Sequence, residues 1–212
     1  MAPPQTGLTN FGLHVLHDAP VPQQTTILAA GLGRSGTTML SRIMSALGLY
    51  MGRVLTPQSN EDKEIQLLIK AGDMAGFEEI CRVRDAQHDV WGFKCPAARG
   101  HIANLATHMR NPRAIVVFRD VLAISLRNNI SVGAELVDAM EAAVRGNAVL
   151  ISQVVTAEVP TLMVSYEKAL QYPERCVQAI ADHCGITVSH DQISEIAASC
   201  VRNGDKAYLG IA

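Results

Sequence analysis

The chain has 212 residues, 48% of them hydrophobic and 18% charged, and its formal net charge at pH 7 is −2. This length suits one domain, and the near-neutral charge gives no general argument for nucleic acid or an anionic membrane surface as a partner. The five cysteines are scattered and include no C-x-x-C pair, so we expect neither a disulfide framework nor a zinc site, and a reducing cytosol fits.

The hydropathy pattern adds two further expectations. Residues 1–10 lack the basic and apolar regions of a secretory signal. The chain has no uncharged window of about 18 apolar residues, so we expect no membrane span. Together these features predict a cytoplasmic protein without a metal site, in which local cations bind any anionic ligand.

Residues 1–24 are rich in Pro, Gln and Gly, which predicts a partly ordered lead-in with a short strand at 12–16. We expect residues 25–212 to form one α/β domain. Four short apolar segments alternate with helical patterns in this part of the chain, at 25–30, 91–94, 114–119 and 161–166. This alternation predicts a three-layer αβα domain with a central parallel sheet, similar to P-loop NTPases. Its ligand should lie at the carboxyl ends of the strands.

The stretch at 25–49 combines a strand, a glycine-rich turn and a helix. Gly31, Gly33 and Gly36 lie in the turn, and the helical pattern begins at Thr37. Such glycines let backbone N–H groups turn inward, and the start of a helix adds about half a positive charge. The stretch therefore predicts a phosphate-binding loop. The alternative is an ordinary βα turn that happens to be rich in glycine.

The loop differs from the Walker A pattern in the position of its cation. Gly31 and Gly36 fit G-x-x-x-x-G-K-[ST], but Thr37 stands where that pattern has lysine. A P-loop NTPase uses this lysine on the β- and γ-phosphates, so ordinary ATP or GTP hydrolysis is not expected. The cation of this loop is Arg34.

The sequence GLGRSGTTML resembles the 5′-phosphosulfate loop of sulfotransferases that use 3′-phosphoadenosine 5′-phosphosulfate (PAPS), which reads roughly [KR]-S-G-T-T. The resemblance implies that five consecutive residues bind PAPS: Arg34, Ser35, Gly36, Thr37 and Thr38. It also implies a catalytic role for Arg34, which would neutralise charge on the transferring group.

The segment Asn60-Glu61-Asp62 begins the next helical pattern. Acidic residues complement the dipole in the first turn of a helix, and this accounts for Asp62. Many sulfotransferases carry an N-E-D-like segment here, and its glutamate takes the proton of the acceptor. The resemblance therefore implies Glu61 as the general base, with Glu64 or a histidine as alternatives.

A helix is expected at 76–89, and the strand at 91–94 ends in Lys94-Cys95-Pro96. Sulfotransferases have a lysine at the end of this strand, in a K-x-P setting, so the resemblance implies that Lys94 is catalytic. A fixed ammonium there would stabilise charge on the departing phosphate oxygen. The alternative is an exposed lysine at a strand end. The histidine that often follows two residues later in the family is replaced by Pro96, which favours Glu61 as the base.

The apolar strand at 114–119 ends in Arg119-Asp120, and a helix follows. Sulfotransferases end a strand with R-[DN]-P and place a serine on the next helix, and both groups bind the 3′-phosphate. The resemblance implies these roles for Arg119 and Ser125. The usual spacing is eight residues, whereas Ser125 follows Arg119 by six. A spacing of eight leads to Arg127, to which no ligand role is assigned.

The rest of the chain carries weaker signals. Helices are expected at 98–109, 132–158, 174–184 and 189–202, the first of them with His101 and His108 on one face. The V-S-Y-E segment that ends at Glu167 resembles a family segment that packs the last strand against the cofactor side. The segment 201–205 resembles part of the family's C-terminal loop over the 3′-phosphate.

These resemblances, which span residues 27–175, imply a sulfotransferase that moves a sulfuryl group from PAPS to a hydroxyl or amine by in-line displacement. The desulfated product is 3′-phosphoadenosine 5′-phosphate (PAP). The implied acceptor is a small molecule or a carbohydrate, and no nucleic acid partner is expected. Two alternatives stay open: a non-catalytic nucleotide-binding module and a small-molecule kinase with a degenerate phosphate loop.

Overall fold

The computed structural model describes residues 9–201, and its centre is a five-stranded sheet. The strands are β1 (Leu13–Leu16), β2 (Thr25–Gly31), β3 (Val90–Lys94), β4 (Pro112–Phe118) and β5 (Thr161–Ser165). They lie in the order β1-β5-β4-β2-β3. The four strands β2 to β5 are parallel, while β1 pairs antiparallel with β5 at the edge. The predicted α/β class is confirmed, and β1 is the one described strand that departs from a parallel sheet.

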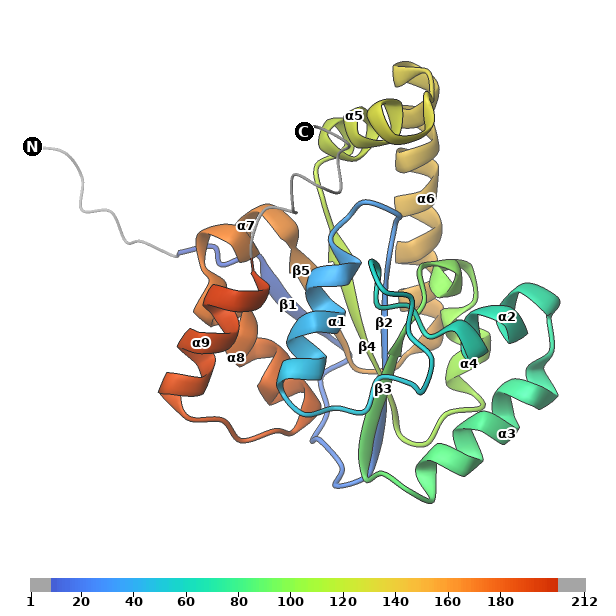
Figure 1. Ribbon diagram of the computed structural model, residues 1–212, viewed down its shortest axis with the longest axis vertical. Coiled ribbons are helices and arrows are strands. Elements are labelled where there is room, and N and C mark those ends of the chain that lie inside the picture. The colour runs from blue at the N-terminus through green and yellow to red at the C-terminus, as the bar shows by residue number, and fades with distance from the viewer. Residues whose placement is uncertain (1–8, 202–212) are drawn as a thin grey trace, which may run out of the picture.

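Helices cover both faces of the sheet (Figure 1). They are α1 (Thr37–Ala46), α2 (Lys63–Ala71), α3 (Met74–Asp85), the 3₁₀ turn η1 (Pro96–Gly100), α4 (Ile102–Ala106), α5 (Val121–Val132), α6 (Leu136–Ala157), α7 (Tyr166–Gln171), α8 (Pro173–Cys184) and α9 (His190–Cys200). Among the described residues, none of these helices has the length and apolar character needed to span a membrane.

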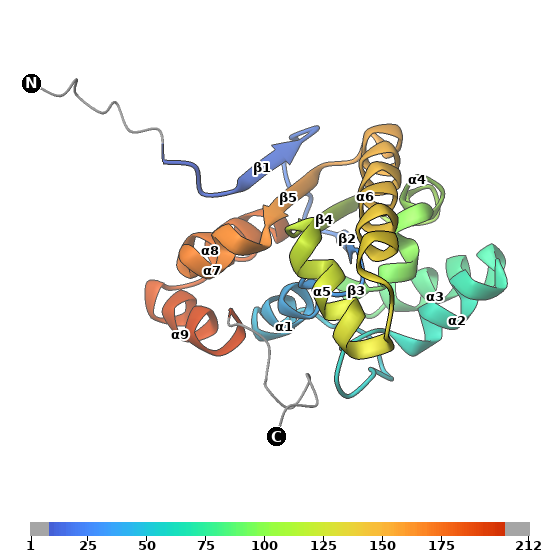
Figure 2. The same cartoon turned by 90° about the horizontal axis from the view of Figure 1, so that it is seen from above.

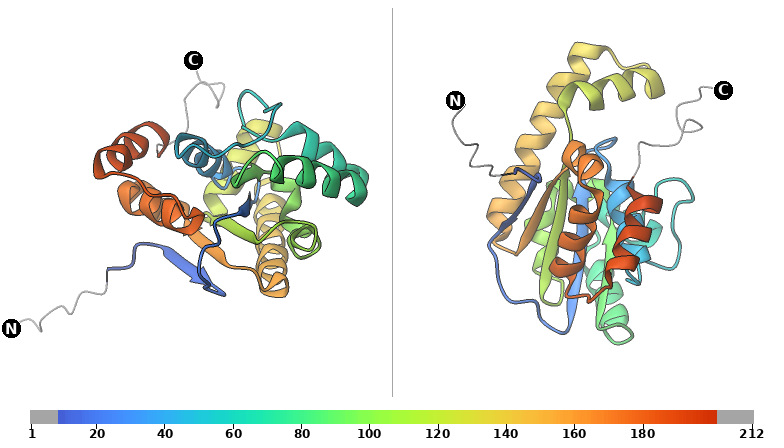
Figure 3. Two further views of the ribbon diagram at one scale, coloured as in Figure 1. Left: turned by 90° about the horizontal axis from the view of Figure 1, so that it is seen from below. Right: turned by 90° about the vertical axis from the view of Figure 1, so that its left-hand side faces the viewer.

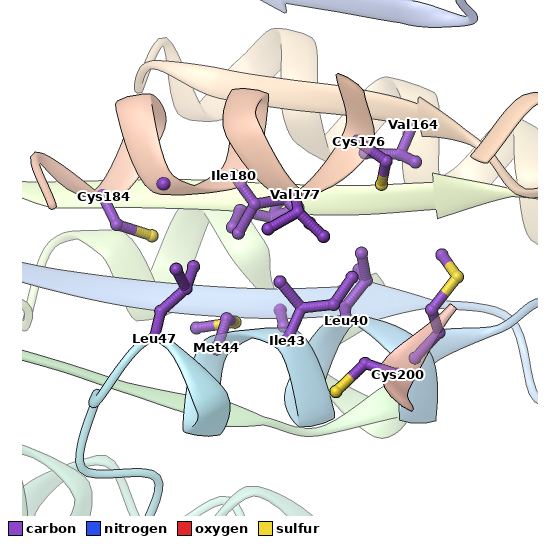
Figure 4. Close-up of a cluster of buried hydrophobic side chains, with 14 of the residues drawn as sticks. Leu40, Ile43, Met44, Leu47, Val164, Cys176, Val177, Ile180, Cys184 and Cys200 are labelled. Atoms are coloured by element: carbon purple, nitrogen blue, oxygen red, sulfur yellow. The ribbon is translucent and has the colours of Figure 1, made fainter. Parts of the chain in front are cut away.

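The sheet lies between two helical layers because its central strands are apolar on both faces. Helices α1, α8 and α9 pack on one face, and α2, α3, α4 and α6 pack on the other (Figure 2). All of β2 is buried. On the first face, Leu40 and Ile43 of α1 meet Val177 and Ile180 of α8 (Figure 4). Each such side chain contributes about 1.5–3 kcal/mol through burial, so α1 is firmly fixed behind the loop that precedes it.

The connectivity places the ligand site at one end of the sheet. Because β2 has β3 on one side and β4 on the other, the direction in which the sheet grows reverses at β2. Open α/β sheets bind ligands at such a point, outside the carboxyl ends of the strands. The α5–α6 pair projects beyond the sheet (Figure 3).

Three expected elements have different limits in the structure. The helix expected at 98–109 is η1 followed by the short α4, so His101 and His108 do not share a helical face. The helix expected from 132 begins only at Leu136, because α5 continues to Val132 and ends at Gly133, whose φ is 66°. The last strand ends at Ser165, whose side chain caps α7.

Candidate functional site

Two glycines, at the end of β2 and in the loop that follows, leave no room for a side chain. A Cβ on Gly31 would lie 2.7 Å from Ser35 Oγ and 2.9 Å from Val117 O. Gly36 has a φ of 106°, and a Cβ there would lie 2.3 Å from the Tyr166 ring. Arg34 also has a positive φ, of 70°. The predicted strand, tight glycine loop and helix are therefore present.

The start of α1 is left open for a ligand. Within residues 9–201, no side chain caps this helix, and its first turn contains no acidic residue. Side-chain oxygens do cap α2, α3, α5, α6, α7 and α9. An uncapped helix start presents N–H groups and partial positive charge, which suits an anion.

A cavity of about 590 Å³ opens at this helix start. The described part of its lining holds five cations and one carboxylate, so the cavity is positively charged. The residues of the lining are Gly33, Arg34, Gly36, Thr37, Thr38, Met39, Arg42, Thr56, Pro57, Gln58, Ser59, Glu61, Gln66, Lys94, Pro96, Ala97, Arg119, Arg127, Tyr166 and Cys200. The structure thus brings most of the expected site residues together, from segments far apart in the chain.

Glu61 and Lys94 form an ion pair in this cavity, with 3.0 Å between Lys94 Nζ and Glu61 Oε1. Lys94 also donates to the Ser59 carbonyl at 2.9 Å, and Gln66 donates to Glu61 Oε2 at 2.6 Å. The lysine is 1% exposed, which answers the alternative of an exposed strand-end lysine. Burial lowers the pKa of the Lys94 ammonium below its ordinary value, although the Glu61 carboxylate opposes the shift. The two residues therefore form a fixed acid–base pair in which the ammonium is buried and the Glu61 side chain is 18% exposed.

Arg119 follows β4 and lies against the loop. Its Nη1 donates to the Arg34 carbonyl at 3.0 Å, and its guanidinium lies 4.5 Å from the centre of the Tyr166 ring. The Glu167 carboxylate is 4.0 Å from Arg119 Nε. This Nε is buried and has no hydrogen-bond partner among the described residues. Arg119 therefore supports the loop through the Arg34 carbonyl, and its Nε can still donate a hydrogen bond to a ligand beside the loop.

Two expected cofactor ligands lie outside the cavity lining. The Ser35 hydroxyl is 1% exposed and donates to the Leu32 carbonyl at 2.7 Å, within the loop. Ser125 is fully buried, and its hydroxyl donates to the Val121 carbonyl at 2.7 Å, one turn back in α5. Arg127, two residues further along α5, does line the cavity. The binding roles of the two serines stay predictions, because each hydroxyl already has an internal partner.

Two residues that shape the site, Ser59 and Gln66, were not expected from the sequence, and Tyr166 was expected only as part of the V-S-Y-E segment. The Ser59 carbonyl accepts from Lys94 and also from Thr38 Oγ1, at 3.4 Å. Gln66 bonds Glu61, and the Tyr166 ring lies between Gly36 and Arg119. Gln66 lies in the first turn of α2, five residues after Glu61, and this short separation was the available signal for Gln66. A backbone carbonyl such as that of Ser59 leaves no signal in a sequence.

Two other expectations concern metal ligands and the C-terminal segment. Within residues 9–201, no group of three or more His, Cys, Asp or Glu side chains is arranged to bind a metal ion. The C-terminal segment 201–205 lies outside the described residues, apart from Val201.

Comparison with known proteins places this fold. No family model and no curated protein matches the chain. Among solved structures, the sulfotransferase domain of the Synechococcus PCC 7002 olefin synthase is 15% identical. It aligns with 91% of this chain and 84% of its own, at a TM-score of 0.61. Sulfotransferase STF1 from Mycobacterium tuberculosis H37Rv is 18% identical over 91% of this chain and 75% of its own, with a TM-score of 0.55.

Mouse sulfotransferase SULT7A1, solved in complex with PAP, is 15% identical. The match covers 85% of this chain and 64% of the mouse chain, with a TM-score of 0.52. At identities this low, the likeness establishes the fold and no more. The chain therefore has the fold of sulfotransferase domains, as the resemblance of its phosphate loop implies.

Proposed function

We propose that this protein is a cytoplasmic sulfotransferase that moves a sulfuryl group from PAPS to a hydroxyl or amine of a small-molecule or carbohydrate acceptor. One observation carries the proposal: the ion pair between Glu61 and the buried Lys94 shares a cavity with the uncapped start of α1. A module that only binds a nucleotide has no need of a carboxylate there. The five described cysteines are all unpaired and buried, which suits the cytoplasm.

The residues present fit a ligand with two anionic ends. The open helix start of α1 suits an anion, and the buried Nε of Arg119 can donate a hydrogen bond to one. Arg34, Gly36, Thr37 and Thr38 would bind the phosphosulfate end. PAPS, when bound, supplies a sulfuryl group on a phosphate leaving group.

Arg119 and Arg127 would bind the 3′-phosphate. Both side chains line the cavity, and both guanidinium groups are suited to phosphate. Ser125 would first have to release the Val121 carbonyl and leave a fully buried position. We therefore assign to Arg127 the place that the family spacing of eight residues predicts.

Lys94 would stabilise negative charge on the departing oxygen. Its burial makes this electrostatic contribution larger than it would be in water. Glu61 would accept the proton of the attacking hydroxyl or amine. Both of its oxygens are held by donors, Lys94 and Gln66, so the carboxylate is fixed and still has lone pairs for the acceptor.

A transfer assay tests the proposal. The protein is incubated with ³⁵S-labelled PAPS and a fractionated small-molecule extract that serves as the acceptor pool. We expect the label to move to a small molecule with the wild type, and not with Glu61→Gln or Lys94→Ala. Release of the label only as inorganic sulfate, at equal rates for all three proteins, would argue against a transferase.

A further inference from the structure

Directly behind the Glu61–Lys94 pair lies a second ion pair, Asp62–Arg84. Arg84 Nη1 donates to Asp62 Oδ2, and the two residues are 4% and 0% exposed. Asp62 Oδ1 also accepts the backbone N–H groups of Glu64 and Ile65, so this carboxylate caps α2. From the sequence, Asp62 was expected only to complement the helix dipole in a first turn.

Asp62 is connected to both members of the Glu61–Lys94 pair. It follows Glu61 in the chain, and its backbone N–H donates to the Lys94 carbonyl at 3.3 Å. It also caps the helix that carries Gln66, which bonds Glu61. A shift of Asp62 would therefore move the Glu61 carboxylate, its Gln66 partner and the end of β3 relative to one another.

Arg84 connects the same carboxylate to the strand that carries Lys94. Its guanidinium lies 5.1 Å from the centre of the Trp91 ring, and Trp91 is fully buried in β3, three residues before Lys94. The centre of the Tyr50 ring lies 5.5 Å from the same guanidinium. Arg84 Nη2 also donates to Glu64 Oε2 at 3.2 Å, in the first turn of α2. Arg84 thus holds the start of α2 against β3.

Stability alone is a poor explanation for this arrangement. Taking two charges out of water costs about as much as their attraction returns, and apolar residues of the same volume often stabilise a fold equally well. The two Nη atoms of Arg84 donate to two carboxylates, those of Asp62 and Glu64. Such a planar, two-pronged contact fixes the distance and orientation of the segments that it joins. The segments joined here carry Glu61 and Lys94.

We propose that Asp62 and Arg84 are positioning residues that hold the Glu61 carboxylate and the Lys94 ammonium in their working geometry. The proposal rests on the proposed function. Neither residue lines the described part of the cavity, and so both act through Glu61 and Lys94.

A double-mutant cycle on PAP binding, measured by calorimetry, tests this role. The double variant Asp62→Asn/Arg84→Gln replaces the ion pair with an uncharged hydrogen-bonding pair, and Asn keeps the helix cap. In the wild-type background, Lys94→Ala should weaken PAP binding about tenfold, the loss expected for one charged hydrogen bond. In the double-variant background, Lys94→Ala should weaken it less than about threefold, because the ammonium is no longer held in place.

A core variant serves as the matched control. Ile180→Val lowers stability on the opposite face of the sheet, and it should leave the roughly tenfold effect of Lys94→Ala intact. If the double variant does not fold, Arg84→Lys takes its place, since lysine keeps the charge and loses the fork. In the Arg84→Lys background, too, Lys94→Ala should weaken PAP binding less than it does in the wild-type background.

The outcomes separate this role from the proposed function. Equal effects of Lys94→Ala in the wild-type and pair-variant backgrounds would show that Asp62 and Arg84 only stabilise the fold. If the wild type itself does not bind PAP, the proposed function fails and the positioning role fails with it.

Discussion

At the scale of single residues, the site depends on how Lys94 is buried. Its ammonium has two protein acceptors, Glu61 Oε1 and the Ser59 carbonyl, and almost no contact with water. A charge in this position acts through a low local dielectric and needs little reorganisation when negative charge develops nearby. Glu61 depends on the same contact, because Lys94 and Gln66 fix its two oxygens.

Glu61→Gln should separate chemistry from binding. Glutamine keeps the shape of the side chain and cannot take a proton, so kcat for sulfuryl transfer should fall by about 10² to 10⁴. The affinity for PAP should change by less than about threefold, since Glu61 has no role on the nucleotide. Steady-state kinetics and PAP calorimetry measure the two effects. An unchanged kcat would mean that another group is the base.

Arg127→Ala and Ser125→Ala form a matched pair on α5. Loss of Arg127 should weaken PAP binding about tenfold or more, the value of a charged hydrogen bond, and should reduce its salt dependence. Ser125→Ala should change PAP affinity by less than about twofold, because its hydroxyl is bonded to Val121 within the helix. Affinity titrations at two salt concentrations compare the variants. If Ser125→Ala weakens PAP binding more than Arg127→Ala does, the serine is the ligand.

At the scale of elements, the phosphate loop is where the sequence pattern was most informative. Strand, glycine turn and helix lie within 25–49, so local rules of backbone conformation decide their structure. The direction of β1 could not be predicted in this way, because it depends on pairing with β5, about 150 residues later. For the same reason, the Glu61–Lys94 distance became known only from the structure.

The geometry of α5 distinguishes Ser125 from Arg127. Successive residues of a helix turn by about 100°, so Ser125 and Arg127 point in different directions. Ser125 adjoins the buried Ile124 on the inward face of α5, and Arg127 reaches the cavity. The match of residue types along the chain favoured Ser125 as the ligand of the 3′-phosphate. The face of α5 that reaches the cavity favours Arg127 instead.

Gly36→Ala tests the loop as an element. The φ of 106° and the close Tyr166 ring should together lower the free energy of unfolding by about 1–3 kcal/mol or more. Gly33→Ala is the control, since a Cβ there would have no atom within 4 Å, and its effect should stay within about 0.5 kcal/mol. Chemical denaturation of both variants gives the comparison. Equal stabilities would mean that the loop is more adaptable than its geometry indicates.

At the scale of the whole molecule, a buried histidine at the end of the sheet opposite the cavity makes stability depend on pH. His183 of α8 is 4% exposed, and burial lowers its pKa from 6.5 to about 4, with the nearby Arg113 guanidinium acting in the same direction. Arg113 Nη2 lies 3.4 Å from His183 Nδ1. Asp18 opposes the shift, as does a hydrogen bond between His183 and the backbone of Ala114.

This shift predicts acid sensitivity. Above pH 6.5 the imidazole is neutral in the folded and the unfolded chain, and its contribution to stability is complete. As the pH falls from 6.5 to about 4, only the unfolded chain gains the proton, so the free energy of unfolding falls by up to about 3 kcal/mol. Denaturation of the wild type and of His183→Gln across this range measures the loss. Equal pH profiles for the two proteins would contradict it.

Across the molecule, the proposed function requires the positively charged cavity to bind the two anionic ends of PAPS. Calorimetric titration with PAP and with ATP–Mg²⁺, on the wild type and Arg119→Ala, tests this claim most directly. We expect the wild type to bind PAP at least about tenfold more tightly than ATP–Mg²⁺, and we expect Arg119→Ala to lose about tenfold or more of that affinity. A preference for ATP–Mg²⁺, or PAP binding that is unchanged in Arg119→Ala, would contradict the account.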